Sequence, residues 1–222
     1  MAVITINTAE KDAWDRLVLS SPEATYAQLH GWRRVIQESY AHSCYNFECW
    51  DGKDLVGILP TAHLKSRLFG NQMVSMPYLD TGGPLYRDRQ ICQALVNAVK
   101  GKASELGADV CLRCLDAEMC DWPKQADKVT MYLPLQREPN DMLKVFSSER
   151  RNRIKKAIKN GLRVSCHRED GLDDFYAIFT QNMRDLGSPV HSKRFFKEVL
   201  ATFKDETGLL VVHGTDEKPI GA

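Results

Sequence analysis

The same order of predicted elements occurs twice in this chain, over residues 2–59 and again over residues 162–222. In each copy an apolar strand is followed by two helical stretches, a second strand, a polar turn and the start of another strand. Aligning Gly57 with Gly221 gives an offset of 164 residues (221 − 57), which is the length of a whole domain. The second copy stops within its hairpin, so we expect one complete α/β domain and the first part of another.

The periodicity of apolar residues predicts the elements of both copies. Up to residue 135 it predicts strands at 2–6, 44–50, 55–59, 72–76, 110–115 and 129–135, and helices at 9–19, 29–40 and 88–106. A basic helix at 140–160 follows, and the second copy predicts strands at 162–166, 209–213 and 219–222 and helices at 171–186 and 193–204. Asp170 and Ser192 are the expected N-caps of the last two helices.

These elements predict an α/β fold with a mixed sheet. We expect a first domain at 1–137, a basic connecting helix at 138–161 and an incomplete second domain at 162–222. The hydrophobic fraction of 43% is ordinary for a globular protein and excludes a disordered or fibrous chain.

Charge and hydropathy exclude several locations and partners. Thirty basic residues against 29 acidic ones create no overall field that would hold nucleic acid or anionic lipid. The first turns are charged, unlike a signal peptide, and no apolar run approaches the roughly 20 residues that span a bilayer. We predict a cytoplasmic protein, with peripheral association at the inner membrane face as an alternative.

The seven cysteines are an odd number spread over predicted strands and helices, so we expect them to be reduced and mostly buried. Cys111 and Cys114 have the spacing of a redox or zinc pair, but residues three apart in a strand point to opposite faces. No zinc-spaced histidines, Walker loop or Ser–His–Asp arrangement on a nucleophile elbow is present, and the histidines are scattered. The sequence therefore predicts no metal.

Five phrases, in this order, resemble the FemAB-like branch of the GNAT acyltransferase superfamily. They are Gln28–Trp32, Leu55–Pro60, Met76–Gly83, Arg150–Ala157 and Met183–Val190. The last two, with Ser192–Phe196, are most similar to the FemAB-like proteins that accompany bacterial exosortase systems.

The resemblance implies two GNAT-like domains in tandem, here a truncated tandem, and the transfer of an acyl or aminoacyl group to an amine. In the better known members the donor is aminoacyl-tRNA and the acceptor is the peptide of a peptidoglycan precursor. For this chain it implies a cell-envelope precursor that bears an amine and is linked to a nucleotide or lipid diphosphate.

In the family, donor binding belongs to the later part of the second domain. We therefore assign no cofactor to residues 1–222 and expect them to be catalytically inactive alone. One alternative is an acyl-CoA-dependent N-acyltransferase acting on a polysaccharide or lipid amine. Another is a non-catalytic module that binds phosphate or nucleic acid.

The basic helix is the first candidate binding site. It carries Arg150, Arg151, Arg153 and Lys155, whose charges can hold a diphosphate or a tRNA backbone. The alternative is a solvated linker, which is what a run of charges usually means.

The loop that contains Asp80, Gly82 and Gly83 is the second candidate, because adjacent glycines let backbone N–H groups approach a ligand. A role as a turn alone is equally consistent with the sequence. Gln28 and Trp32, four apart on one predicted helix, are candidates for an acceptor groove, although a core role suits Trp32 better.

The third candidate segment runs from Arg184 to Arg194 around a predicted turn between helices. His191 lies there and titrates near neutrality, so it is a candidate for the base that takes the proton from the acceptor amine. A histidine in a turn is more often a surface or capping residue. Arg184 is the candidate substrate-binding residue of this segment.

Overall fold

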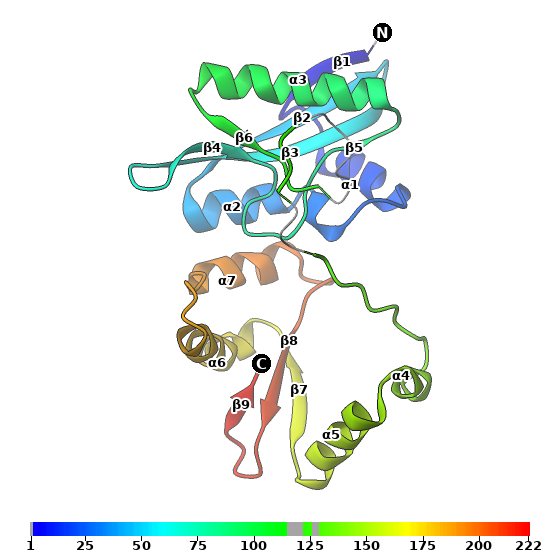
Figure 1. Cartoon of the computed structure of the whole chain (residues 1–222), viewed down its shortest axis with the longest axis vertical. Coiled ribbons are helices and arrows are strands. Elements are labelled where there is room, and N and C mark those ends of the chain that lie inside the picture. The colour runs from blue at the N-terminus through cyan, green and yellow to red at the C-terminus, as the bar shows by residue number, and fades with distance from the viewer. Residues whose placement is uncertain (1, 115–121, 126–128) are drawn as a thin grey trace. The chain divides into compact units, whose positions relative to one another are not determined.

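The computed structural model describes residues 2–114, 122–125 and 129–222. The chain forms two compact units that divide after residue 127, here called the N-terminal and the C-terminal unit (Figure 1). Both units combine helices with a β-sheet, and the predicted mixed α/β class is confirmed. The domain boundaries proposed at 137 and 161 stay predictions.

The N-terminal unit is built on one mixed sheet. Its order is β1-β2-β3-β4-β6, with β5 pairing β3 off this path. Adjacent strands are antiparallel except β4 and β6, which run parallel. The strands are β1 Ala2–Ile6, β2 Ser43–Asp51, β3 Asp54–Ser66, β4 Gly70–Val74, β5 Leu85–Tyr86 and β6 Asp109–Cys111.

Helices cover both faces of this sheet, with α3 on one face and α1 and α2 on the other (Figure 1). They are α1 Lys11–Ser20, the 3₁₀ helix η1 Tyr26–Gln28, α2 Trp32–Tyr40 and α3 Arg89–Glu105. The core under α3 joins Leu95 and Val99 to Phe47 and Met73 of the sheet, all fully buried. This burial of apolar side chains on both faces is what stabilises the sheet.

Helix α3 has well-defined ends and lies very close to the sheet. The Asp88 carboxylate accepts a hydrogen bond from the Ile91 N–H at 3.0 Å and so caps its start. Gly107, at φ +61°, ends it. A Cβ atom at Gly57 would lie 2.4 Å from Ile91 Cγ2, so only glycine lets the helix approach β3 this closely.

Strands β4 and β5 both pair with the same edge of β3, but with different parts of it. Strand β4 pairs with residues 62–66, whereas β5 pairs with Gly57 and Ile58. Residues 75–84 connect the two and leave the sheet between them. We call this segment the 75–84 loop.

The C-terminal unit has an antiparallel sheet in the order β7-β8-β9. Its elements are α4 Pro139–Val145, α5 Ser148–Lys159, β7 Arg163–His167, the 3₁₀ helix η2 Glu169–Gly171, α6 Leu172–Asp185, α7 Lys193–Thr202, β8 Leu209–His213 and β9 Pro219–Gly221. A small core joins Leu172, Leu200 and Leu209. Ser192 caps α7 as predicted, since its hydroxyl accepts from the Phe195 N–H.

Three expectations about local structure were wrong. Residues 129–135 form no strand, and their apolar side chains are exposed; Pro134 lacks the N–H that a central strand would need. The helix expected at 140–160 is interrupted because Ser147 caps a new helix, α5. Asp170 lies in η2 and does not cap α6, whose N-cap position is Gly171.

Within the described residues, no helix has the length and hydropathy that crossing a bilayer requires. The same residues contain no group of three or more His, Cys, Asp or Glu side chains arranged to hold a metal ion.

Candidate functional site

A cavity of about 760 Å³ lies beside the 75–84 loop in the N-terminal unit. This volume is within the range of small-molecule sites. The loop, η1, β5 and the segment after β6 supply its walls. The lining residues are Glu23, Thr25, Gln28, Thr81, Gly82, Gly83, Pro84, Leu85, Tyr86, Arg87, Arg113 and Cys114. Three residues predicted to bind substrate, Gln28, Gly82 and Gly83, are therefore brought together.

Gln28 ties η1 to the loop. Its amide nitrogen donates to the Gly83 carbonyl oxygen at 3.1 Å, and its amide oxygen accepts from the Thr25 N–H at 2.7 Å. The side chain is buried, with 6% of its surface exposed, and both of its polar atoms have partners. Gln28 therefore positions the cavity wall, and its predicted contact with an acceptor stays a prediction.

The two glycines have no room for a side chain. A Cβ atom at Gly82 would lie 2.3 Å from Met76 Cβ, and one at Gly83 would lie 2.6 Å from Cys114 Sγ. Even alanine at either position would force the loop away from its neighbours. The sequence favoured a turn and a ligand contact equally, and the close packing supplies a structural reason for both glycines.

Hydrogen bonds to the segment after β6 hold the loop in place. The Gly82 N–H donates to the Arg113 carbonyl oxygen at 3.0 Å, and the Arg113 N–H donates to Ser75 Oγ at 2.7 Å. The Arg113 guanidinium also donates to the Leu79 carbonyl oxygen at 2.6 Å. Each of these bonds involves at least one backbone group, and together they preorganise the cavity wall.

At the start of the loop, Tyr78 adopts a left-handed backbone conformation, with φ +70°. Its hydroxyl lies 2.7 Å from His42 Nε2, and its ring packs 4.3 Å from that of Tyr40. Burial raises the pKa of Tyr78 and lowers the pKa of His42. Both groups are therefore neutral near pH 7, and their contact is an uncharged hydrogen bond that anchors the loop.

Trp32 and Asp80 do not line the cavity. Trp32 begins α2, whereas Gln28 lies in η1, so the two are not on one helix as predicted. The Trp32 ring is buried, and its Nε1–H donates to the Tyr26 carbonyl oxygen at 2.8 Å. Asp80 is exposed on the loop. Burial raises the pKa of Tyr26, and the negative charge of Asp80 raises it further.

The basic candidates lie together on α5, where six basic side chains accompany a single acidic one, Glu149. No residue of α5 is buried. Arg153 pairs with Glu149 at 2.5 Å, and the Arg151 guanidinium donates to the Phe146 carbonyl oxygen at 2.5 Å. Arg150 lies over the Phe146 ring and Lys155 is exposed. The helix thus presents a strongly basic, solvated surface.

His191 and Arg184 lie in the C-terminal unit. The His191 ring stacks on Phe195 with 4.9 Å between ring centres, and burial lowers the pKa of His191. A neutral imidazole can accept a proton, so a role as base stays a prediction. Arg184, at the end of α6, is exposed and pairs with the adjacent Asp185.

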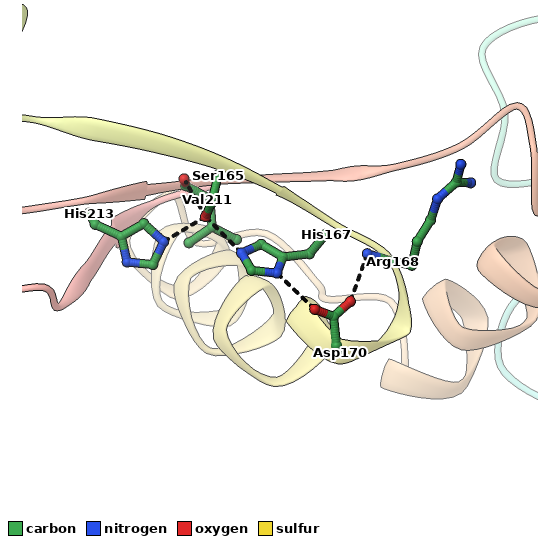
Figure 2. Close-up of polar contacts among 6 residues, drawn as sticks. All are labelled: Ser165, His167, Arg168, Asp170, Val211 and His213. Atoms are coloured by element: carbon green, nitrogen blue, oxygen red, sulfur yellow. Dashed lines mark hydrogen bonds and ion pairs between the residues drawn. The ribbon is translucent and has the colours of Figure 1, made fainter.

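A group of polar side chains that sequence reasoning missed lies on β7 and β8 (Figure 2). Ser165 Oγ lies 2.7 Å from Nε2 of both His167 and His213, and His167 Nδ1 lies 3.0 Å from Asp170 Oδ2. The histidines are therefore not all scattered. The sequence signal that could have found this cluster is the placement of Ser165 and His167 two residues apart, on one face of a strand. His213 lies on the neighbouring strand.

These residues have the connectivity of a Ser–His–Asp triad, but their setting differs from that of a hydrolase. Ser165 lies within a strand and not on a sharp turn between strand and helix. Its oxygen is already within 3.5 Å of two imidazoles and of the Val211 carbonyl oxygen. The arrangement suits the retention of a proton better than attack on a substrate.

Comparison with known proteins finds one family match over part of the chain and solved structures with a similar fold. Residues 124–214 match the model of the FemAB family. The solved structure described as "Crystal structure of FemX" is similar, with a TM-score of 0.67 and 13% sequence identity, covering 94% of this chain and 57% of that chain. The chain thus spans 57% of the length of that structure.

A ribosomal-protein-alanine N-acetyltransferase from Brucella melitensis biovar Abortus 2308 is a weaker neighbour. Its TM-score is 0.40 at 15% identity, covering 60% of this chain and 99% of that one. No curated protein matches the chain.

Proposed function

We propose that this chain, which matches the FemAB family over residues 124–214, is an acyl or aminoacyl transferase component that modifies an amine of a cell-envelope precursor. The match to the FemAB family over residues 124–214 and the FemX-like fold support the class of transferase. The cavity beside the 75–84 loop supports a binding role for the N-terminal unit.

We base the assignment of the acceptor site on one observation, which is the set of residues that line this cavity. Gln28, Gly82 and Gly83 were candidate substrate-binding residues in the sequence, and all three line it. The wall they form is fixed by hydrogen bonds from η1 and from the segment after β6. We propose that the amine-bearing precursor binds there.

Charge favours an acceptor that carries a phosphate or another anionic group. The lining residues include two arginines, Arg87 and Arg113, and one acidic residue, Glu23. The Arg87 guanidinium also pairs with Asp51 and Asp88, and the Arg113 guanidinium donates to the Leu79 carbonyl oxygen. Arginine is well suited to phosphate and carboxylate groups because its planar donors bind them in pairs. A diphosphate-linked precursor matches this lining better than a cationic ligand does.

The basic surface of α5 is assigned to a polyanion, for which tRNA is the candidate. Its six basic side chains lie within residues 148–159, on a helix that has no buried residue. Such binding weakens as salt rises, because phosphate contacts release counterions. The donor is then aminoacyl-tRNA, with acyl-CoA as the alternative. We expect turnover to require more of a FemAB-like protein than residues 1–222.

A binding titration tests the acceptor site. The probe is a nucleotide-diphosphate-linked peptide precursor with a free amine, and the variants are Gly83→Ala and the control Gly101→Ala. Alanine at Gly83 meets Cys114 Sγ at 2.6 Å, whereas at Gly101, in α3, it meets nothing within 4 Å. We expect Gly83→Ala to lose at least about tenfold in affinity, which is about 1.4 kcal/mol. Equal binding by a folded Gly83→Ala protein would contradict the proposed site.

The same titration, carried out with tRNA, distinguishes a nucleic-acid-binding module from a transferase component. Charge reversal of Arg150, Arg151 and Lys155 to Glu should weaken tRNA binding and reduce its salt dependence. A pure binding module would use α5 and leave the cavity empty. Loss of tRNA binding in this variant, with no precursor bound by the wild-type protein, would therefore favour the binding module.

A further inference from the structure

The cluster of polar side chains on β7, β8 and η2 holds these elements together (Figure 2). We call Ser165, His167, Asp170 and His213 the Ser165 network. It joins both strands to η2 through Asp170 and to the β8–β9 turn, where His213 Nδ1 lies 3.2 Å from the Glu217 carbonyl oxygen. Gly171 permits the close approach of η2, since a Cβ there would lie 2.4 Å from His167 Cβ.

The hydrogens of this network can be counted. Its four contacts run from the Glu217 carbonyl oxygen to His213, from His213 to Ser165, from Ser165 to His167 and from His167 to Asp170. Each contact needs one hydrogen. Two neutral imidazoles supply one N–H each, and the serine hydroxyl supplies one O–H.

The neutral network is therefore short of one hydrogen. The Glu217 carbonyl oxygen can only accept, and Asp170 accepts while it is ionised. The hydrogen bond from His167, followed by that from the Arg168 N–H, keeps the pKa of Asp170 below its usual value, so this carboxyl does not supply the missing hydrogen near pH 7. If Ser165 instead donates to the Val211 carbonyl oxygen, at 3.5 Å, the shortage grows.

The charged groups on the surrounding elements are mostly paired with one another. Arg163 of β7 pairs with Glu217 of the turn, Lys197 of α7 pairs with Glu169 of η2, and Lys193 of α7 pairs with Asp173 of α6. The Arg168 guanidinium donates to the Thr207 carbonyl oxygen, and Asp174 of α6 is exposed. Asp170 is the carboxylate that faces an imidazole, so a positive charge on His167 has a partner.

We propose that the Ser165 network is a binding site for one proton, held as an imidazolium on His167 in the folded protein. His167 then donates to both Asp170 and Ser165, Ser165 donates to His213 Nε2, and neutral His213 donates to the Glu217 carbonyl oxygen. Loss of the proton breaks one of the four contacts. The site thereby makes the attachment of β7–β8 to η2 and to the β8–β9 turn sensitive to pH.

Nitrogen-15 NMR of the imidazole rings in the 222-residue protein tests the proposal. At pH 7.5 the wild-type protein should show one network histidine with both ring nitrogens protonated. His191 is the internal control, because burial lowers its pKa and it should be neutral. Two neutral network histidines in the folded wild-type protein would overturn the proposal.

Ser165→Ala separates the shared hydroxyl from the rest of the network. Without it, two contacts remain, and the two neutral imidazoles supply both hydrogens, so the extra proton should be released. Ser165→Thr keeps a hydroxyl and should keep the proton. If the imidazolium persists in Ser165→Ala, the number of available hydrogens does not determine protonation of the network. That result would also overturn the proposal.

Unfolding as a function of pH gives a second measurement. Free histidines lose their proton at about pH 6.5, so above this pH the folded wild-type protein would bind one more proton than the unfolded chain. The stability of the wild-type protein should then fall as pH rises. For each pH unit, its unfolding equilibrium constant should rise by up to about tenfold relative to that of Ser165→Ala. Parallel pH profiles for the two proteins would contradict the proposal.

Discussion

Glu48 shows how a charged side chain can belong to the core of the N-terminal unit. It lies on β2 with 1% of its surface exposed, yet its carboxylate has several donors. Thr5 Oγ1, Thr8 N and Oγ1, and Ala9 N donate to it at 2.5–3.0 Å. A buried carboxylate is tolerated when such bonds replace its hydration. Glu48 thus fixes the segment that connects β1 to α1.

We predict that Glu48→Gln destabilises the protein by about 2–4 kcal/mol, because an amide N–H₂ would face donors that then lack an acceptor. Glu10→Gln is the control. Glu10 is exposed and makes no capping hydrogen bond, so its replacement should stay within about 0.5 kcal/mol. Chemical denaturation measures both, and equal stability of the two variants would show that the carboxylate bonds contribute little.

Individual residues were harder to predict than elements. Gln28 was selected for the right region, but its partner, the Gly83 carbonyl oxygen, lies 55 residues along the chain. Ser165 and His213 are separated by 48 residues. Contacts at such distances depend on strand register and loop path, which periodicity does not specify. The basic residues of α5 were easier to predict, because a run of charges on one helix is visible without knowledge of distant contacts.

At the scale of elements, the repeated hairpin is the feature that the sequence predicted best. Strands β2 and β3 form one hairpin and β8 and β9 form the other, both antiparallel. Gly57 and Gly221 occupy the aligned positions but have different surroundings. A Cβ at Gly57 would meet Ile91 at 2.4 Å, whereas at Gly221 its nearest neighbour, Val212 Cβ, is 3.4 Å away.

The aligned glycines should therefore respond differently to substitution. We predict that Gly57→Ala destabilises the N-terminal unit by about 1–3 kcal/mol, because α3 must move away from the sheet. Gly221→Ala makes only an ordinary contact and should change stability by less than about 0.5 kcal/mol. Thermal unfolding of the two variants tests this difference. Equal losses of stability in the two variants would mean that Ile91 of α3 can move aside with little loss of free energy.

Element boundaries were predicted where a capping residue marks them, as at Ser192. Prediction failed where an apolar pattern had no partner. Residues 129–135 alternate as a strand does, but their side chains stay exposed, and Pro134 weakens the backbone pairing they would need. The basic helix was divided because Ser147 can cap a helix as well as continue one.

For the whole molecule, the family match and the cavity come from different parts of the chain. The match to the FemAB family spans residues 124–214, whereas every residue that lines the cavity lies before residue 115. The FemX-like fold covers 94% of the chain and so includes both. The order of elements predicted this fold class, but the residues that would contact a substrate remain a proposal.

Hydrogen exchange of the 222-residue protein, with and without the diphosphate-linked amine precursor, tests the central proposal most directly. If the precursor occupies the cavity, amides in η1 and in residues 79–87 should exchange more slowly, because the ligand restrains the loop. Amides of β8 and β9 should be unaffected by the precursor. Protection confined to the C-terminal unit, or absent from both units at saturating precursor, would contradict an acceptor site beside the 75–84 loop.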